Sequence, residues 1–482
     1  MIDAAVDRHV DEHAPVRDGL PAPARYYAMA AVMLGISLSV LDSTIVNLAL
    51  PGIGRELHTS ASGTIWIVNA YQLAILALLL PLAMLGDLIG YRRVYLCGVA
   101  LFTLASAACA FAPNLGVLTI ARAVQGLGAS GIMAVNPALV RLVYPRRLFG
   151  RGMAINSVTV ATASVAGPSI AALILSVASW PWLFIVNVPV GLTVLLLAWR
   201  VMPENPTPPP AGARLRPMDA VLNALMFGLV FLGVDALGAE SAGSSSPNWG
   251  HALALLGAGA LIGVVYVRRQ FALAVPMLPL DLLRIPVFAL SMCTSIGAFA
   301  AQTLSNIALP FLLLEVYGRT HAEAGLLITA WPAGVVMVAP IVARLIGRYP
   351  DGLISGIGLA LLAAGLASMS LLPPQPGNLD IAWRMLMSGI GFGLFQSPNN
   401  HAIVTSAPAH RSGGASGMLA SARLTGQTMG AIMLATVFSA FGVQGGRGPS
   451  IALAIGAGLA AVASGFSTLR VRHSEARAAE RG

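Results

Sequence analysis

Apolar stretches of membrane-spanning length fill most of the chain and are separated by short polar segments. A helix needs about 20 apolar residues to cross the hydrocarbon core of a bilayer, and these stretches lack the period-two alternation of half-buried strands. The pattern predicts an all-α polytopic membrane protein with fourteen transmembrane helices. We place them near residues 27–50, 63–86, 94–112, 115–140, 152–178, 183–201, 219–239, 250–268, 286–314, 322–346, 352–372, 380–403, 413–441 and 449–469.

Two polar breaks divide the predicted helices into groups of six, two and six. Residues 202–217 are rich in proline and have no apolar period, which predicts a cytoplasmic linker, and residues 241–250 form a polar loop. The expected organisation is an N-terminal tail (1–25), a six-helix bundle (26–201), the linker (202–218), two additional transmembrane helices (219–268), a second six-helix bundle (269–470) and a C-terminal tail (471–482).

The composition supports this class of protein. Hydrophobic residues make up 57% of the chain and charged residues 10%, and the mean hydropathy is +0.79, whereas soluble domains carry about 25% charged residues. The net charge of +9 could indicate a nucleic-acid partner, but most arginines lie in the loops that share a side with the predicted termini. Arginine-rich loops face the cytoplasm. We therefore expect an inner (plasma) membrane protein with both termini cytoplasmic and no nucleic-acid partner.

A carboxylate lies inside the first apolar stretch. Asp42 is expected about 12 Å below the outer membrane surface, where an ionised group costs at least ~2.5–3.5 kcal/mol on insertion scales. Arg122, in the fourth stretch, is expected about 10 Å below the same surface, so the two can pair. We expect Asp42 to switch between protonated and ionised forms and to couple transport to protons. The alternative is a static buried ion pair, which stabilises a protein poorly.

Two further segments are candidates for holding helices together. Asp87, Arg92 and Arg93 surround a glycine turn after the second helix and predict a salt-bridge latch, although an ordinary basic turn explains the arginines equally well. Gly167 and Pro168 lie in a helix rich in small residues, which allow helix backbones to approach closely. They predict a tight contact where the two halves meet, with generic helix packing as the alternative.

Polar and aromatic residues within the apolar helices are candidates for lining a substrate cavity. Aromatic rings offer cation–π faces, although in helix bundles they more often only pack, and a carboxylate at an outer helix end could recruit cations. Asn187 is expected to have a mainly structural role at a helix start, and the three cysteines to be small core residues. The cavity candidates are Asn47, Trp66, Tyr71, Gln125, Gln302, Asn306, Glu315, Trp331 and Asn400.

Together these motifs resemble the fourteen-helix drug:proton antiporters of the major facilitator superfamily, the multidrug and quaternary-ammonium efflux branch. The resemblance covers about residues 25–470. It is carried by residues 41–51, by Arg122 with Gln125 and Gly126, by residues 180–191 and by residues 309–318. The chain departs from the family pattern at Ala83, Leu88, Tyr91, Ala163, Ala171, Ala172 and Leu314.

The resemblance implies a transporter that is not an enzyme, needs no cofactor and uses the proton gradient to export small molecules by alternating access. Protons would load Asp42, and the substrates would be lipophilic cations such as quaternary ammonium compounds. Two alternatives stay open: a dedicated exporter of one endogenous metabolite, lipid or natural product, and a non-transporting membrane sensor or scaffold. Charges held inside the bilayer argue against a scaffold but do not separate the two kinds of exporter. A periplasmic adaptor is an open question.

Overall fold

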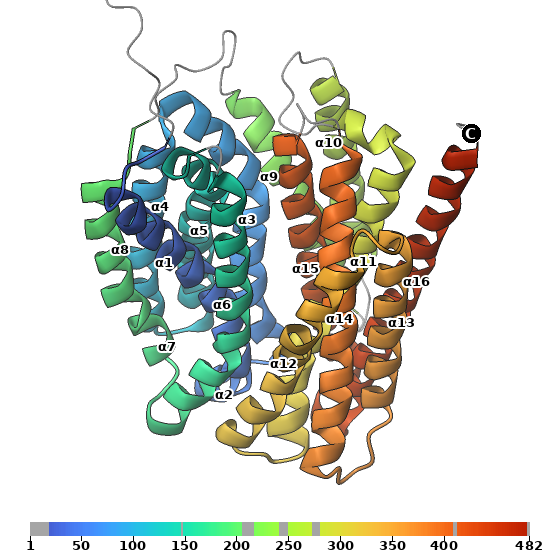
Figure 1. Cartoon of the computed structure of the whole chain (residues 1–482). Helices are drawn as coiled ribbons and strands as arrows, with labels where there is room; N and C mark the ends of the chain where they lie inside the picture. Colours follow the sequence, from blue (N-terminus) through green and yellow to red (C-terminus); the bar gives the residue numbers. More distant parts are fainter. Residues whose placement is uncertain are drawn as a thin grey trace, which may run out of the picture.

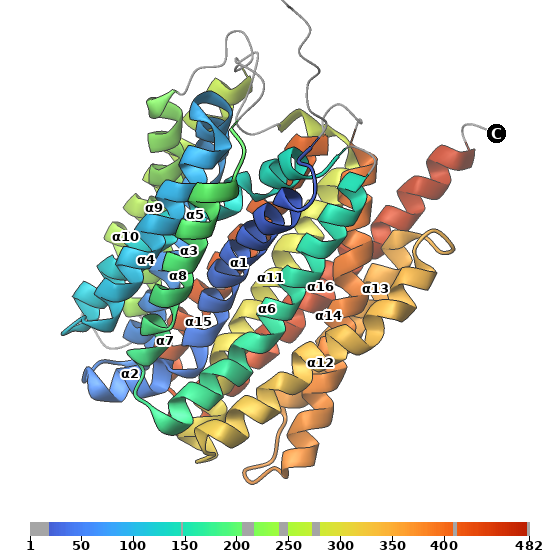
Figure 2. The ribbon, with the colours of Figure 1, turned by 60° about the vertical axis from the view of Figure 1, so that its left-hand side comes forward.

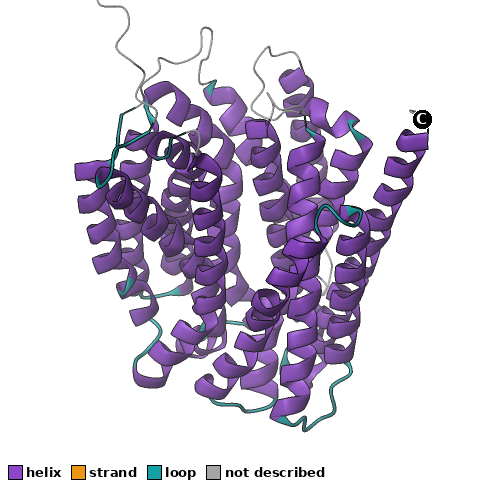
Figure 3. Ribbon diagram, viewed as in Figure 1, coloured by secondary structure: helices purple, strands orange, loops and turns teal. Residues whose placement is uncertain are grey.

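The computed structural model describes residues 19–145, 148–204, 216–240, 249–271, 280–407 and 412–479. Within these ranges the chain forms long helices joined by turns (Figure 3), and the β pairing found there is an isolated bridge between Ile346 and Tyr349. Most of the predicted linker and of the N-terminal tail lies outside the described residues.

The first bundle lies on the left in Figure 1, and within the described residues it contains six long helices and three short ones. They are α1 (Ala24–Ile45), η1 (Val46–Leu48), α2 (Leu50–Glu56), α3 (Ala61–Ile89), α4 (Tyr91–Ala110), α5 (Leu115–Val143), α6 (Phe149–Val177), α7 (Trp182–Ile185) and α8 (Asn187–Val201).

The remaining helices form an additional pair and the second bundle. The pair is α9 (Pro217–Glu240) and α10 (Trp249–Phe271), and the bundle is η3 (Leu280–Arg284), α11 (Pro286–Phe311), η4 (Leu312–Val316), α12 (His321–Leu345), α13 (Asp351–Ser370), α14 (Asn378–Ser406), α15 (Ser412–Phe441), η6 (Gln444–Gly446) and α16 (Arg447–Ala479). The last helix thus continues beyond the boundary at residue 470 that we predict for the C-terminal tail.

Polar residues at the helix starts explain several of these boundaries. The Ser60 hydroxyl accepts a hydrogen bond from the Gly63 N–H at the start of α3, and the Asn114 side chain accepts one from the Val117 N–H at the start of α5. Thr320 and Glu323 form a reciprocal capping box at the start of α12. Each cap satisfies a backbone donor that the first helical turn leaves unpaired.

Among the described residues, twelve helices are long and apolar enough to cross a membrane. The prediction of an all-helical polytopic membrane protein is confirmed. Of the fourteen spans that we expected, twelve are supported. The other two, α9 and α14, are not among these twelve. α14 carries polar residues such as Arg384, Gln396 and Asn399 along its length, which lowers its mean hydropathy.

Both described termini lie at the same end of the molecule, called the terminal end below, and the opposite end is called the far end (Figure 1). Contacts at the far end join the bundles, among them an ion pair, a hydrogen bond and a close helix approach. Arg55 of α2 forms a 2.8 Å ion pair with Glu315 of η4. The Ser169 and Thr329 hydroxyls of α6 and α12 lie 2.7 Å apart. Gly325 of α12 has no room for a side chain beside Ala172 of α6, since a Cβ there would lie 2.2 Å from the alanine Cβ.

A second seam between the bundles runs along α3 and α15, which pack against each other, and α9 contacts both. The Asn223 side chain of α9 donates to the Ala77 carbonyl of α3, and Phe231 of α9 meets the Trp66 ring edge-on with centroids 4.6 Å apart. Helix α9 therefore lies on the seam between the bundles, and α10 packs beside α9 (Figure 2).

Candidate functional site

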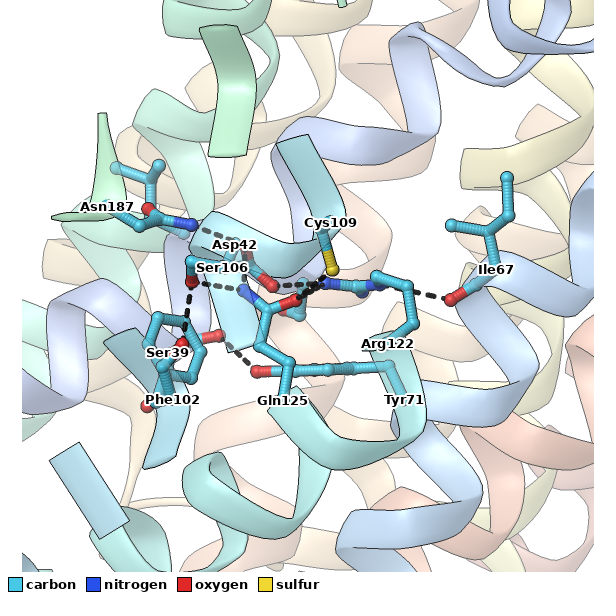
Figure 4. A network of polar contacts seen from close by, with 12 residues as sticks. Ser39, Asp42, Ile67, Tyr71, Phe102, Ser106, Cys109, Arg122, Gln125 and Asn187 are labelled. Atoms are coloured by element: carbon cyan, nitrogen blue, oxygen red, sulfur yellow. Dashed lines mark hydrogen bonds and ion pairs between the residues drawn. The ribbon is translucent and has the colours of Figure 1, made fainter. Parts of the chain in front are cut away.

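Asp42 lies near the end of α1, immediately before the chain tightens into η1, and its side chain is 0% exposed. Its Oδ2 forms a 2.5 Å ion pair with Arg122 Nη1. Its Oδ1 accepts two hydrogen bonds, from Gln125 Nε2 at 2.9 Å and Asn187 Nδ2 at 2.7 Å (Figure 4). All three partners are donors, which suits an ionised carboxylate, because that group only accepts.

Arg122 is held from several sides. Its Nη1 donates to Gln125 Oε1 at 2.6 Å as well as to Asp42, and its Nε donates to the Ile67 carbonyl of α3 at 3.1 Å. Its guanidinium carbon lies 4.1 Å above the Tyr71 ring, whose hydroxyl donates to the Ser39 carbonyl. The arginine side chain is 1% exposed. The pair predicted from matching depth is therefore present, and it is sealed from solvent.

Gln125 connects this ion pair to α4. It lies three residues after Arg122, so both side chains lie on one face of α5. Its Nε2 also donates to the Ser106 hydroxyl at 2.8 Å, and its Oε1 accepts from Cys109 Sγ at 3.6 Å. Together with Asn187 at the start of α8, these contacts tie α1, α3, α4, α5 and α8 to one carboxylate.

The sequence did not indicate three of the network's members. Asn187 was expected to be mainly structural, Cys109 to be a core residue, and Ser106 was not singled out. A polar residue in an apolar helix was the available signal for Asn187 and Ser106. Which face of α4 or α8 meets Asp42 depends on tertiary packing, which the pattern of one helix does not reveal.

The network has a chemical consequence for proton binding. A proton on Asp42 would remove the negative charge that compensates Arg122 inside a dry protein interior, where an uncompensated charge is costly. Proton uptake would therefore favour any conformation in which Arg122 finds another partner or water. The proton-coupling role of Asp42 and Arg122 stays a prediction.

The latch candidates do not come together. Tyr91 donates a hydrogen bond to Asp87, while Arg92 contacts Glu204 at 3.2 Å and the Trp199 carbonyl at 2.6 Å. Arg93 is exposed. A salt bridge between Asp87 and either arginine is not found among the described residues. Arg92 instead connects α4 to the end of α8.

Gly167 and Pro168 contribute to two different contacts. A Cβ on Gly167 would lie 2.0 Å from Thr44 Oγ1, so this glycine allows α6 to approach α1 within the first bundle. The Pro168 carbonyl instead lies on the side of α6 that faces Gly325 in the second bundle. The contact between the halves that we predicted for the motif thus lies beside Pro168 and Ala172.

The cavity candidates divide into three groups. Tyr71 and Gln125 belong to the Asp42 network and are buried, whereas Trp66 is partly exposed and packs on α9. The prediction that these three residues line a substrate cavity stays a prediction. Glu315 pairs with Arg55 at the far end. The others lie in the second bundle or near η1: Gln302, Asn306, Asn400 and Asn47 are partly exposed, and Trp331 is buried with its Nε1 unpartnered.

A separate pocket of about 430 Å³ opens at the far end beside Arg55, Glu56, Trp180 and His321. In the described parts of the chain, no three His, Cys, Asp or Glu side chains come together as metal ligands would.

Comparison with known proteins assigns the family. The model of the Major Facilitator Superfamily matches residues 32–431. The chain belongs to the major facilitator superfamily. Its members are membrane transporters and not enzymes. The chain is 49% identical over 461 residues to YebQ, an uncharacterised transporter of Escherichia coli K12. The aligned region covers 96% of this chain and 99% of YebQ.

Two further similarities are informative. The chain is 32% identical over 420 residues to the multidrug resistance protein Stp of Mycobacterium tuberculosis strain CDC 1551 / Oshkosh, covering 86% of this chain and 76% of Stp. A bacterial homologue of the human lysosomal transporter Spinster, solved in an inward-facing and unoccupied conformation, superposes with a TM-score of 0.65 at 16% identity, covering 94% and 98% of the two chains. That similarity supports the fold.

Proposed function

We propose that this facilitator is a proton-coupled exporter, a drug:proton antiporter, that moves amphiphilic and toxic compounds out of the cell. The observation that carries the proposal is the sealed network around Asp42, because a carboxylate and a guanidinium inside the membrane mark a proton or ion pathway. The likeness to a multidrug resistance protein supports export as the direction.

The geometry suggests how the proton would act. α1 carries Asp42 and continues through η1 into α2, where Arg55 pairs with Glu315 of the other bundle. A proton that loosens the Asp42–Arg122 pair would change the end of α1, and thereby the far-end contacts between the bundles. In the orientation we propose, the termini are cytoplasmic and the far end faces outward. The described conformation is then closed on the outside.

We also propose that α9 and α14 cross the bilayer, which gives fourteen spans in an inner membrane. At 1.5 Å per residue their 24 and 29 residues extend about 36 and 43 Å, more than the ~30 Å hydrocarbon core. α14 also packs between α12 and α13, both candidate spans, so its polar residues lie among neighbouring helices.

The expectation of cationic substrates came from the family resemblance, and Asp42 would be the acidic residue that suits them. Its side chain is fully buried and already accepts from three donors, so a substrate does not reach it in this conformation. The proposal therefore covers amphiphilic compounds without assigning them a positive charge.

Transport in inverted membrane vesicles tests the proposal. Respiring inverted vesicles acidify their lumen, and export appears as uptake of a dye from the medium. Two xanthene dyes of opposite charge, rhodamine 6G and fluorescein, serve as probes. We expect uptake of at least one dye that stops with an uncoupler and with Asp42→Asn. Absence of uptake of both by well-inserted protein would refute the exporter. Uncoupler-sensitive uptake by Asp42→Asn at the wild-type rate would refute the assignment of Asp42.

A further inference from the structure

A second arginine lies inside the membrane region, and no carboxylate of the described residues pairs with it. Arg423 lies in α15, about 17 Å along the axis from the helix start at 1.5 Å per residue. Its side chain is partly exposed. Its one described interaction is with a ring: the guanidinium carbon lies 5.3 Å from the centre of Phe299 of α11.

The helix geometry places Arg423 between the two bundles. Gly426 of α15 packs directly on Ile296 of α11, and Leu424 packs in the cluster that contains Leu79 of α3. At about 100° per residue, Arg423 lies about 60° from Gly426 and about 100° from Leu424, within the sector that separates these two contacts. Gln427, one turn later, falls in the same sector and is also partly exposed. This side of α15 lies between its contact with α11 of the second bundle and its contact with α3 of the first bundle.

An aromatic cluster lies beneath the guanidinium. Phe299 meets Phe392 and Phe395 of α14 with ring centroids 5.5 and 6.2 Å apart. Trp331 of α12 extends the cluster, 6.3 Å from Phe392, and its indole N–H is buried without a partner. The second bundle thus combines an arginine with no described ionic partner, a contiguous cluster of buried aromatic rings and an unused donor.

The charges of the two bundles differ in whether they have a described ionic partner. The Asp42 charge in the first bundle is compensated by Arg122 and sealed from solvent. Arg423 in the second bundle is partly exposed, and among the described residues it has no ionic partner. The partly exposed polar residues on α11, Gln302 and Asn306, are neutral. A molecule entering between the bundles would therefore meet a positive charge at Arg423.

We infer that Arg423 binds the acidic group of the exported compound, so that the substrates are lipophilic aromatic acids rather than cations. This inference rests on the proposed export function. A guanidinium matches the geometry of a carboxylate, sulfonate or phenolate oxygen and forms strong charge-assisted hydrogen bonds with it. Holding an unpaired arginine inside a membrane is costly, and an anionic substrate would supply the missing partner.

The vesicle assay with the two xanthene dyes tests this directly. We expect wild-type vesicles to take up fluorescein, the anion, in preference to rhodamine 6G, the cation. Arg423→Gln should lower fluorescein uptake at least about tenfold, since it removes a charged hydrogen-bond partner, and Arg423→Lys should retain part of it. The matched control is Arg447→Gln, which makes the same change at an exposed far-end position and should transport fluorescein as wild type does.

The outcomes separate the two proposals. Uncoupler-sensitive uptake of rhodamine 6G without fluorescein would overturn the acid class while leaving proton-coupled export standing. Equal fluorescein uptake by wild type and by well-inserted Arg423→Gln would overturn the role of Arg423. Uptake of neither dye by wild type would overturn both proposals. Because Arg423 has no described ionic partner, its replacement leaves no orphaned carboxylate, and Arg423→Lys provides a second variant if the glutamine variant inserts poorly.

Discussion

The sealed ion pair makes a quantitative prediction about stability. Asp42→Asn keeps the shape of the side chain but leaves Arg122 as a buried, uncompensated cation, and Arg122→Gln leaves Asp42 as a buried, uncompensated anion. Both side chains are at most 1% exposed. Breaking such a pair by removing one partner costs about 3–5 kcal/mol. The double variant removes both charges at once and should be less destabilised than either single variant.

The expected shift in melting temperature follows from the size of the chain. An unfolding entropy of about 2.1 cal/mol/K per residue gives about 1 kcal/mol/K for 482 residues. A loss of about 4 kcal/mol then lowers the midpoint by about 4 °C in each single variant. The double variant should regain most of that shift, which appears as a coupling energy in a double-mutant cycle.

Thermal unfolding of purified protein in one detergent, at constant pH and scan rate, measures all four proteins of the cycle. Ser43→Ala, one residue away from Asp42, is the matched control, because that hydroxyl donates only to the Val40 carbonyl of its own helix. An unchanged midpoint for Asp42→Asn would mean that Asp42 is already protonated in this state, and the argument from an ionised pair would fail. Additive shifts in the double variant would show that the two residues do not interact.

The remaining predictions concern helix contacts. Gly167→Leu should abolish transport and keep insertion, because even a Cβ would lie 2.0 Å from Thr44 Oγ1. The control Gly458→Leu, where a Cβ meets nothing within 4 Å, should transport normally. Equal transport by both variants would exclude a tight α1–α6 contact. Arg55→Glu should favour opening at the far end by only about 1.4- to 5-fold, since both side chains of the pair are partly exposed to solvent. The charge-reversed pair Arg55→Glu with Glu315→Arg should restore the closed state. Maleimide labelling of Ser179→Cys in the far-end pocket, with Cys97 and Cys293 replaced by serine, reports this opening; labelling that ignores the charge reversal would refute it.

Hydropathy predicted the helical class well because each apolar stretch must bury its backbone polar groups within one helix in the bilayer. It was less informative for α9 and α14. The polar residues along α14 lower its hydropathy, although neighbouring helices surround it. The pairing of Asp42 with Arg122 could be predicted because depth along a helix follows from residue counting alone.

Partners across the bundles could not be predicted in the same way. Glu315 was considered for recruiting cations, but it pairs with Arg55, which is 260 residues away in sequence. Trp66 was considered for a substrate face, but α9 covers it with Phe231. Both outcomes depend on which helix packs against which, information that periodicity within one helix does not contain. The missing counter-ion of Arg423 is harder still, because recognising it requires the position of every neighbouring carboxylate.

The separation of the two charged sites constrains the mechanism. Asp42 and Arg122 lie in the first bundle and compensate each other, whereas Arg423 lies on α15 of the second bundle and has no ionic partner among the residues that the structure describes. A proton and a substrate that bind at these places do not compete for one carboxylate. Coupling between them would then pass through the contacts that join the bundles, which include the α3–α15 seam and the far-end contacts of Arg55, Ser169 and Gly325. Substitutions in those contacts should therefore uncouple proton movement from transport without changing which compounds bind.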